Sequence, residues 1–210
     1  MTVATAAAAP ADEQDTAKRR QILEGARAVF LAQGFDGASM NDVARGAAVS
    51  KGTLYAYFPS KEALFEALVR EGRARQAERF ATLTDDLPPA ETLRRFGVSL
   101  MEMMATPESV AQLRAIIGVT AKFPQIGRAF YEAGFAHGVE KLAAYLAAET
   151  ARGRLAVAEP GMAATQFLDL CKAGLLQRLL FGVDETLARA QIEANVARAV
   201  ATFMAAFGPR

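Results

Sequence analysis

Apolar residues recur every three or four positions along most of the chain, which is the spacing of an amphipathic α-helix. The first such segment spans about residues 16–33. It places Ile22, Ala26 and Phe30 on one face, and Gly34 follows as a stop signal. Runs of β-branched residues are scarce. The pattern predicts an all-α protein with nine helices, at about residues 16–33, 40–47, 51–57, 61–82, 89–105, 108–121, 125–151, 160–181 and 185–206.

Breaks in this pattern predict how the chain is organised. The alanine-rich start, MTVATAAAAPADEQD, has neither a basic segment nor a strong apolar core, so it does not resemble a signal peptide. We expect residues 1–15 to form a disordered tail. The segment TDDLPPAET interrupts the helices again. The sequence therefore predicts one helical domain at residues 16–61 and a second at 62–210, joined by the helix at 61–82.

The last two long helices carry more apolar surface than one packing face requires. The helix at 185–206 has a continuous apolar stripe, and the helix at 160–181 is apolar on more than one side. Such a stripe most often packs within its own domain. The surplus favours self-association over that alternative, and the small Gly174 permits a close approach. The residues expected at the contact between two copies are Phe167, Gly174, Leu175, Ile192, Val196, Val200 and Phe203.

Composition and charge narrow the possible functions only slightly. The net charge is +1, and residues 1–75 hold ten Lys or Arg against nine Asp or Glu, so global charge gives no support for nucleic-acid binding. The single cysteine, Cys171, excludes an intramolecular disulfide, which fits a reducing cytoplasm. No apolar run approaches the roughly 20 residues of a membrane span. We expect a cytoplasmic protein that does not contact a membrane.

A short stretch, GASMNDVARGAAVSKGTLYAYFPSKEALF, is far more informative than the composition. Ser39 and Asp42 have the spacing of a capping box that opens one helix. A tight turn at residues 48–49 leads to Ser50, which is placed to cap the next helix, and Leu54 supplies its inward face. Two short helices joined by a turn and packed on a longer first helix form a helix-turn-helix unit.

The second short helix has a weakened front end, because Gly52 lies in its first turn at a cost of roughly 1 kcal/mol relative to alanine. Taken alone, such a helix is more often a connector. In a helix-turn-helix unit, however, its N-terminus enters the major groove of DNA, where a residue without a side chain allows close approach. Its free N–H groups favour a phosphate oxygen. Further candidates for contacts to bases or phosphates are Lys51, Thr53, Tyr55, Tyr57 and Lys61.

Residues 17–69 resemble the DNA-binding domain of TetR-family transcriptional regulators, and VSKGTLYAYFPSKEALF matches that family's signature nearly throughout. Met40 stands where some members have a polar base-reading residue, and Ala48 stands where the family usually has glycine. We expect Ala48 to strain the turn by about 1 kcal/mol. The resemblance implies a DNA surface formed by Ser39, Met40, Ser50, Lys51, Gly52, Thr53, Tyr55, Tyr57 and Lys61.

The segments AKFPQIGRAFYEAGF and GRLAVAEPGMAATQFLDLCKAGLLQRLLFG resemble the C-terminal domain of the AefR-like branch of that family. This resemblance implies a homodimer formed by the last two long helices, and a small-molecule pocket within the C-terminal domain. Methionines adapt to irregular apolar shapes and would suit a largely apolar effector. The pocket candidates are Met101, Met104, Ile117, Phe123, Phe130, Phe135, His137, Phe167 and Cys171, although ordinary core packing is the alternative for each.

Together these features predict a ligand-responsive repressor that binds a palindromic operator on double-stranded DNA as a homodimer and is released by its effector. A helical enzyme is one alternative, but no Gly-rich phosphate loop, HExxH or CxxC motif is present, and no carboxylate pair has a distinctive spacing. We therefore expect no catalytic residue, no metal and no cofactor. A dimeric adaptor without DNA binding is the other alternative, and it leaves the arrangement from Ser50 to Lys61 without a purpose.

Overall fold

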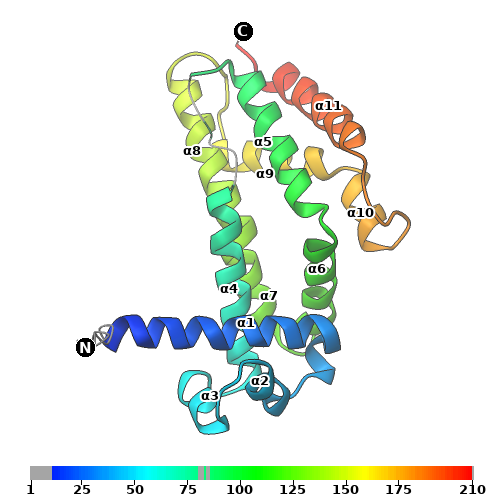
Figure 1. Cartoon of the computed structure of the whole chain (residues 1–210). Helices are drawn as coiled ribbons and strands as arrows, with labels where there is room; N and C mark the ends of the chain where they lie inside the picture. Colours follow the sequence, from blue (N-terminus) through cyan, green and yellow to red (C-terminus); the bar gives the residue numbers. More distant parts are fainter. Residues whose placement is uncertain (1–10, 80–82, 84–85, 210) are drawn as a thin grey trace, which may run out of the picture. The chain divides into compact units, whose positions relative to one another are not determined.

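The computed structural model describes residues 11–79, 83 and 86–209, and every regular element in these ranges is a helix (Figure 1). The all-α prediction is confirmed. None of the described helices is both long and apolar enough to cross a bilayer. The helices are α1 (Ala11–Gly37), α2 (Met40–Gly46), α3 (Lys51–Tyr57), α4 (Lys61–Arg79), α5 (Pro89–Met104), α6 (Pro107–Thr120), α7 (Pro124–Phe130), the π-helix η1 (Tyr131–Ala136), α8 (His137–Ala151), α9 (Pro160–Lys172), α10 (Leu175–Leu180) and α11 (Arg189–Phe207).

The chain divides into two compact units, Met1–Val69 and Arg70–Arg210. The division lies inside α4, whereas the sequence places it at residue 61. Helix α4 is therefore shared by the two units. Its first part carries buried side chains of the N-terminal unit, including Leu64 and Phe65.

Helix α1 begins earlier than the sequence indicates. Residues 11–15 are helical, which corrects this part of the predicted tail, and residues 1–10 lie outside the described residues. The predicted stop at Gly34 is confirmed as a break in the helix, because its φ of 70° and ψ of 172° are not helical. Glycine adopts such a positive φ without the steric cost that a Cβ atom brings.

The N-terminal unit is held together by an aromatic cluster and by one close helix contact. The rings of Phe30, Phe35 and Phe65 lie with their centroids 4.9 to 5.8 Å apart, at the separations that aromatic pairs prefer. Helices α1 and α2 approach so closely that a Cβ atom on Gly25 would lie 2.5 Å from the backbone of Ala47. Side chains larger than hydrogen do not fit at residue 25, so this glycine sets the position of α2 on α1.

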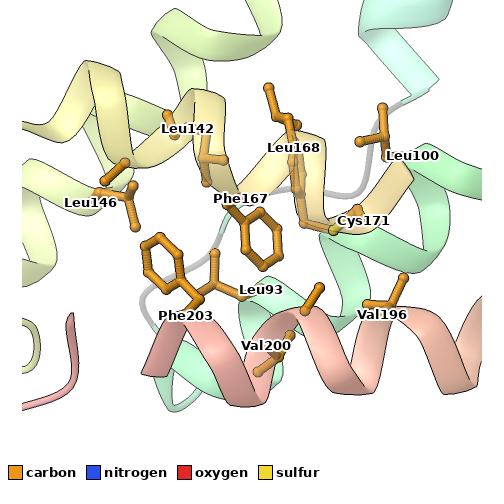
Figure 2. Close-up of a cluster of buried hydrophobic side chains, with 14 of the residues drawn as sticks. Leu93, Leu100, Leu142, Leu146, Phe167, Leu168, Cys171, Val196, Val200 and Phe203 are labelled. Carbon is orange, nitrogen blue, oxygen red and sulfur yellow. The ribbon is translucent and has the colours of Figure 1, made fainter. Parts of the chain in front are cut away.

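The C-terminal unit has its core between α5, α8, α9 and α11. Figure 2 shows side chains of α11 directed toward those of α9, with Phe203 beside Phe167. These two rings meet edge to face with centroids 5.3 Å apart. The apolar stripe of α11 therefore faces the core of its own unit. Five of the residues predicted to contact a second copy are instead buried within one chain, which corrects that prediction for them. They are Phe167, Ile192, Val196, Val200 and Phe203.

Two of the predicted helices are interrupted. The helix expected at residues 125–151 consists of α7, η1 and α8 in succession, so a π-helical segment lies inside it. The helix expected at residues 160–181 ends at Lys172, and α10 starts anew after Gly174, whose φ of 75° is left-handed. A left-handed residue ends an α-helix, and glycine adopts it most readily.

Candidate nucleic-acid interface and ligand pocket

Helix α2 opens with the capping box that the sequence predicts. The Ser39 Oγ accepts a hydrogen bond from the Asp42 N–H at 3.2 Å, and the Asp42 carboxylate accepts one from the Ser39 N–H at 3.1 Å. The hydroxyl and N–H of Ser39 hold the pKa of Asp42 below its ordinary value. Because the Ser39 hydroxyl also donates to this carboxylate, its only proton is engaged within the chain, so the first role of Ser39 is to fix the start of α2.

The turn between α2 and α3 has the predicted strain. Ala48 has a φ of 51°, the one positive φ found at a residue other than glycine among the described residues. The N–H of Ala48 donates to the Arg45 carbonyl at 3.1 Å, and the N–H of Val49 donates to the Ala44 carbonyl at 3.0 Å. These bonds hold the turn in place. An L-residue with a Cβ atom pays roughly 1–2 kcal/mol for this conformation.

Replacing Ala48 by glycine is expected to stabilise the N-terminal unit by about 1 kcal/mol, because the strain in the turn disappears. Urea denaturation followed by circular dichroism measures this change. The matched control is Ala56→Gly, at an exposed position inside α3, which should instead destabilise by about 1 kcal/mol. Equal effects of the two changes would show that the turn is not strained.

Helix α3 buries one side and exposes the other. The Ser50 Oγ accepts a hydrogen bond from the Thr53 N–H at 3.0 Å and so caps the helix as predicted. Leu54 is fully buried against the rest of the unit. On the outer side, Lys51 and Gly52 are exposed, and a Cβ atom on Gly52 would meet nothing closer than 3.8 Å. The front of α3 is thus an open surface.

The two tyrosines of α3 are not equivalent. Tyr55 is 50% exposed, and its ring lies free for contact with a partner. The Tyr57 hydroxyl donates a 2.6 Å hydrogen bond to the Asp15 carboxylate of α1, and this bond raises the pKa of Tyr57. Tyr57 therefore ties α3 to the start of α1. Met40 is half-buried in the first turn of α2. Its side chain has no N–H or O–H group that could donate a hydrogen bond to a base.

Lys61 contacts the chain itself. Its ammonium donates to the carbonyl oxygens of Phe35 at 2.7 Å and of Ala38 at 3.0 Å, and it lies 4.4 Å from the centroid of the Phe35 ring. Two of its three protons are therefore engaged in closing the connection between α1 and α2. The sequence predicts that Lys61 contacts a DNA phosphate, and no sequence pattern indicates that it binds the carbonyl oxygens of Phe35 and Ala38.

A pocket of about 180 Å³ lies in the C-terminal unit, with walls from α5, α6, the segment from α7 to α8, and the α9–α10 region. Of the predicted pocket residues, Met104, Phe130 and Phe135 line it. The π-helix contributes Phe135 and also brings the backbone at Gly134 to the pocket wall. Inserted π-helical turns occur frequently at functional sites.

The other six predicted pocket residues do not line this pocket. Met101, Phe167 and Cys171 are completely buried in the adjoining core of α5, α8, α9 and α11. Burial raises the pKa of the Cys171 thiol to about 12, so the thiol stays protonated. The remaining three are Ile117, which is 58% exposed on α6, and Phe123 and His137, which precede α7 and begin α8.

Most of the pocket wall, including its one ionisable side chain, Lys172, lies outside the residues that the sequence predicts. A lysine inside the otherwise apolar segment FLDLCKAGLL, three residues after its one aspartate, is a signal that could have drawn attention to it. The apolar residues are indistinguishable in sequence from ordinary core positions. The missed lining residues are Phe96, Leu100, Met103, Leu113, Ala133, Gly134, Gly138, Leu168, Lys172 and Leu176.

Comparison with known proteins identifies both units. Residues 22–68 match the model of the bacterial regulatory proteins of the tetR family, and residues 91–209 match the C-terminal domain of AefR-like transcriptional repressors. The chain belongs to the TetR family. The helix-turn-helix of α2 and α3 falls inside the first match, and the pocket falls inside the second.

Individual TetR-family relatives agree with this assignment. The HTH-type transcriptional repressor Rv1474c of Mycobacterium tuberculosis is 30% identical over 177 residues, which cover 80% of this chain and 85% of that protein. The HTH-type transcriptional regulator UidR of Escherichia coli is 44% identical over 104 residues, half of each chain.

Solved structures extend the comparison to nearly the whole chain. A TetR-family transcriptional regulator from Mesorhizobium loti has a TM-score of 0.87 and 27% identity, covering 93% of this chain and 98% of its own. The flavonoid-responsive regulator FrrA has a TM-score of 0.83 and 33% identity, covering 93% and 99%. This chain is therefore a DNA-binding transcriptional regulator of the repressor type and not an enzyme.

Proposed function

We propose that this TetR-family chain is a ligand-responsive repressor that binds a palindromic operator as a homodimer, with α3 as its recognition helix. The proposal rests on the two different sides of α3. Leu54 is buried on the inner side, while Lys51, Gly52 and Tyr55 are exposed. A recognition helix of this kind enters the major groove with its first residues toward the bases. In this arrangement Thr53 contacts base edges, and Lys51 and Tyr55 bind phosphates.

The two copies are proposed to meet along the outer faces of α9 and α11. A groove between these helices is bordered by the small side chains of Ala173 and Ala206, by the apolar Leu170 and Phe207, and also by Asp169. Small residues let the helices of a second copy approach closely, and the apolar residues supply area to bury. The inner faces of the same helices are occupied by the core of one chain.

Replacing Ala206 by arginine is expected to convert the dimer into a monomer at micromolar concentration, because a charged side chain would then lie in the contact. The affinity for the operator should fall when the dimer is lost, since two recognition helices must lie about 34–36 Å apart to enter successive major grooves. Light scattering coupled to size exclusion measures the first effect. Ala201→Arg is the matched control on α11, because residue 201 is exposed but does not border the groove. A stable Ala206→Arg dimer would contradict this contact.

Release of DNA is proposed to follow from a small, largely apolar effector in the pocket of the C-terminal unit. The name of FrrA, which is 33% identical to this chain, describes that protein as flavonoid-responsive, and this supports a response to a small molecule here. Helix α4 belongs to both units, so an effector that shifts it would change the separation of the two α3 helices. The effector releases DNA only to the extent that it binds the non-binding arrangement more tightly.

Electrophoretic mobility shifts test the proposal. Binding to an operator fragment should weaken steeply as salt rises, because each neutralised phosphate releases counterions. Addition of a compound that binds the pocket should release the fragment. An operator affinity that stays the same for every compound bound in the pocket would contradict the proposed response.

A further inference from the structure

Lys172 stands out among the pocket residues by its chemistry. Of the 13 residues that line the pocket, Lys172 alone is ionisable, and the other twelve have hydrocarbon or thioether side chains or are glycine. The Lys172 side chain is only 14% exposed. Its ammonium lies 4.4 Å from the centroid of the Phe135 ring, which also lines the pocket. A cation in this position is attracted by the ring face, and its stem covers apolar surface.

The ion pair of this ammonium has one exposed partner. The Lys172 Nζ lies 2.6 Å from the Asp169 carboxylate, one helical turn earlier on α9. The Asp169 side chain is 64% exposed, so this carboxylate lies at the solvent side of the pair. Ion pairs with an exposed partner are worth little, because solvent screens them. An anion that reaches Lys172 from the pocket can therefore share the ammonium with Asp169, which also borders the groove proposed for the second copy.

A neutral or cationic ligand would fit this pocket less well. A ligand that fills the pocket removes water from the Lys172 ammonium, and burying a charge is costly unless it is paired. The ammonium keeps its ion pair with Asp169 when a neutral ligand binds, whereas a ligand carboxylate adds a second charge-assisted hydrogen bond that an amide or alcohol matches only in part. A cation would be repelled by the ammonium. The apolar remainder of the ligand would contact the side chains of α5 and the π-helix.

We propose that the pocket binds small apolar monocarboxylates, with the ligand carboxylate paired to Lys172 and an apolar body between Phe96, Phe130 and Phe135. This proposal rests on the proposed function, since it names the chemical class of the effector at the same site. The pocket of about 180 Å³ is slightly larger than the roughly 150 Å³ apolar cavity that accommodates benzene. The body is therefore expected to have the size of one substituted benzene ring.

The test compares acids with their neutral isosteres on the full-length protein. Isothermal titration calorimetry at neutral pH with phenylacetate against phenylacetamide, and with cinnamate against cinnamamide, measures the preference for the charge. In the wild type the acids should bind about 10- to 100-fold more tightly than the amides, which is the usual strength of a hydrogen bond to a charged group. Neither DNA nor operator release enters this measurement.

Variants assign the preference to the ammonium. Lys172→Met should reduce the preference for the acid to less than about threefold, and Lys172→Arg should retain most of it because the charge remains. Lys141→Met, an exposed lysine of α8 that does not line the pocket, is the control and should leave the preference unchanged. Gly138→Val should weaken acid and amide alike, since Gly138 lines the pocket and a Cβ atom there meets no protein atom within 4 Å.

Three results would overturn the inference: equal binding of acids and amides to the wild type, a preference that survives in Lys172→Met, or no binding of any acid in the panel. Failure of the proposed function has a different signature. In that case the acids bind with the expected dependence on Lys172, but the affinity for operator DNA stays the same when the pocket is saturated.

Discussion

Replacing Gly52 by glutamate should weaken operator binding by at least about 100-fold while leaving the protein folded. The side chain would project from the open front of α3, where a Cβ atom meets nothing closer than 3.8 Å. It would place bulk and a negative charge where DNA must approach, and like charges brought together at an interface cost several kcal/mol. The fold should not suffer, because an acidic residue in the first turn of a helix is favourable and a glycine is lost.

Gly161→Glu is a closely matched control for this change. Gly161 is also the second residue of its helix, α9, it is exposed, and a Cβ atom there meets nothing within 4 Å. The control adds the same charge in the same helical position in the other unit. Fluorescence anisotropy with labelled operator DNA should show loss of binding for Gly52→Glu and wild-type affinity for Gly161→Glu. Equal affinity of the two variants would place the DNA contact somewhere other than α3.

Replacing Lys61 by methionine should destabilise the N-terminal unit by about 2–4 kcal/mol. The change removes two hydrogen bonds from a charged donor and leaves the carbonyl groups of Phe35 and Ala38 without that donor. Both of these residues are buried, so water does not readily replace the ammonium. Thermal unfolding followed by circular dichroism should show an earlier transition for the N-terminal unit.

DNA binding separates this structural role of Lys61 from a phosphate contact. At a temperature where Lys61→Met is fully folded, the slope of log affinity against log salt should equal that of the wild type. Lys51→Met should behave in the opposite way, with unchanged stability and a slope smaller in magnitude by about one, because Lys51 is exposed on α3. A reduced slope for Lys61→Met would instead support the phosphate contact that the sequence predicts.

The two short helices of the N-terminal unit could be predicted almost to the residue because their signals are local. Ser39 and Asp42 cap α2 across three positions, and Ser50 caps α3 in the same way. The strain at Ala48 follows from the position of one residue in the turn. The start of α1 at Ala11 and the long-range contacts of this unit could not be predicted. The partners of Lys61 lie 26 and 23 residues away, and no pattern in the sequence connects them.

The C-terminal unit could be predicted only in outline. An apolar stripe such as that of α11 shows that one face is buried, but it does not show whether the cover comes from the same chain or from a second copy. The core of α5, α8 and α9 covers it here. The pocket depends on how side chains from several helices meet. The sequence therefore could not show that, of Met101 and Met104, only Met104 lines the pocket.

Selection of bound fragments from random DNA, followed by footprinting of the enriched site, tests the central claim most directly. The claim is that two copies of α3 enter successive major grooves on one face of a duplex. The expected result is an inverted repeat whose half-sites lie about 10 base pairs apart or a multiple of that spacing, protected only by the dimer. Enrichment of no sequence, or of a single half-site bound by one chain, would contradict the claim.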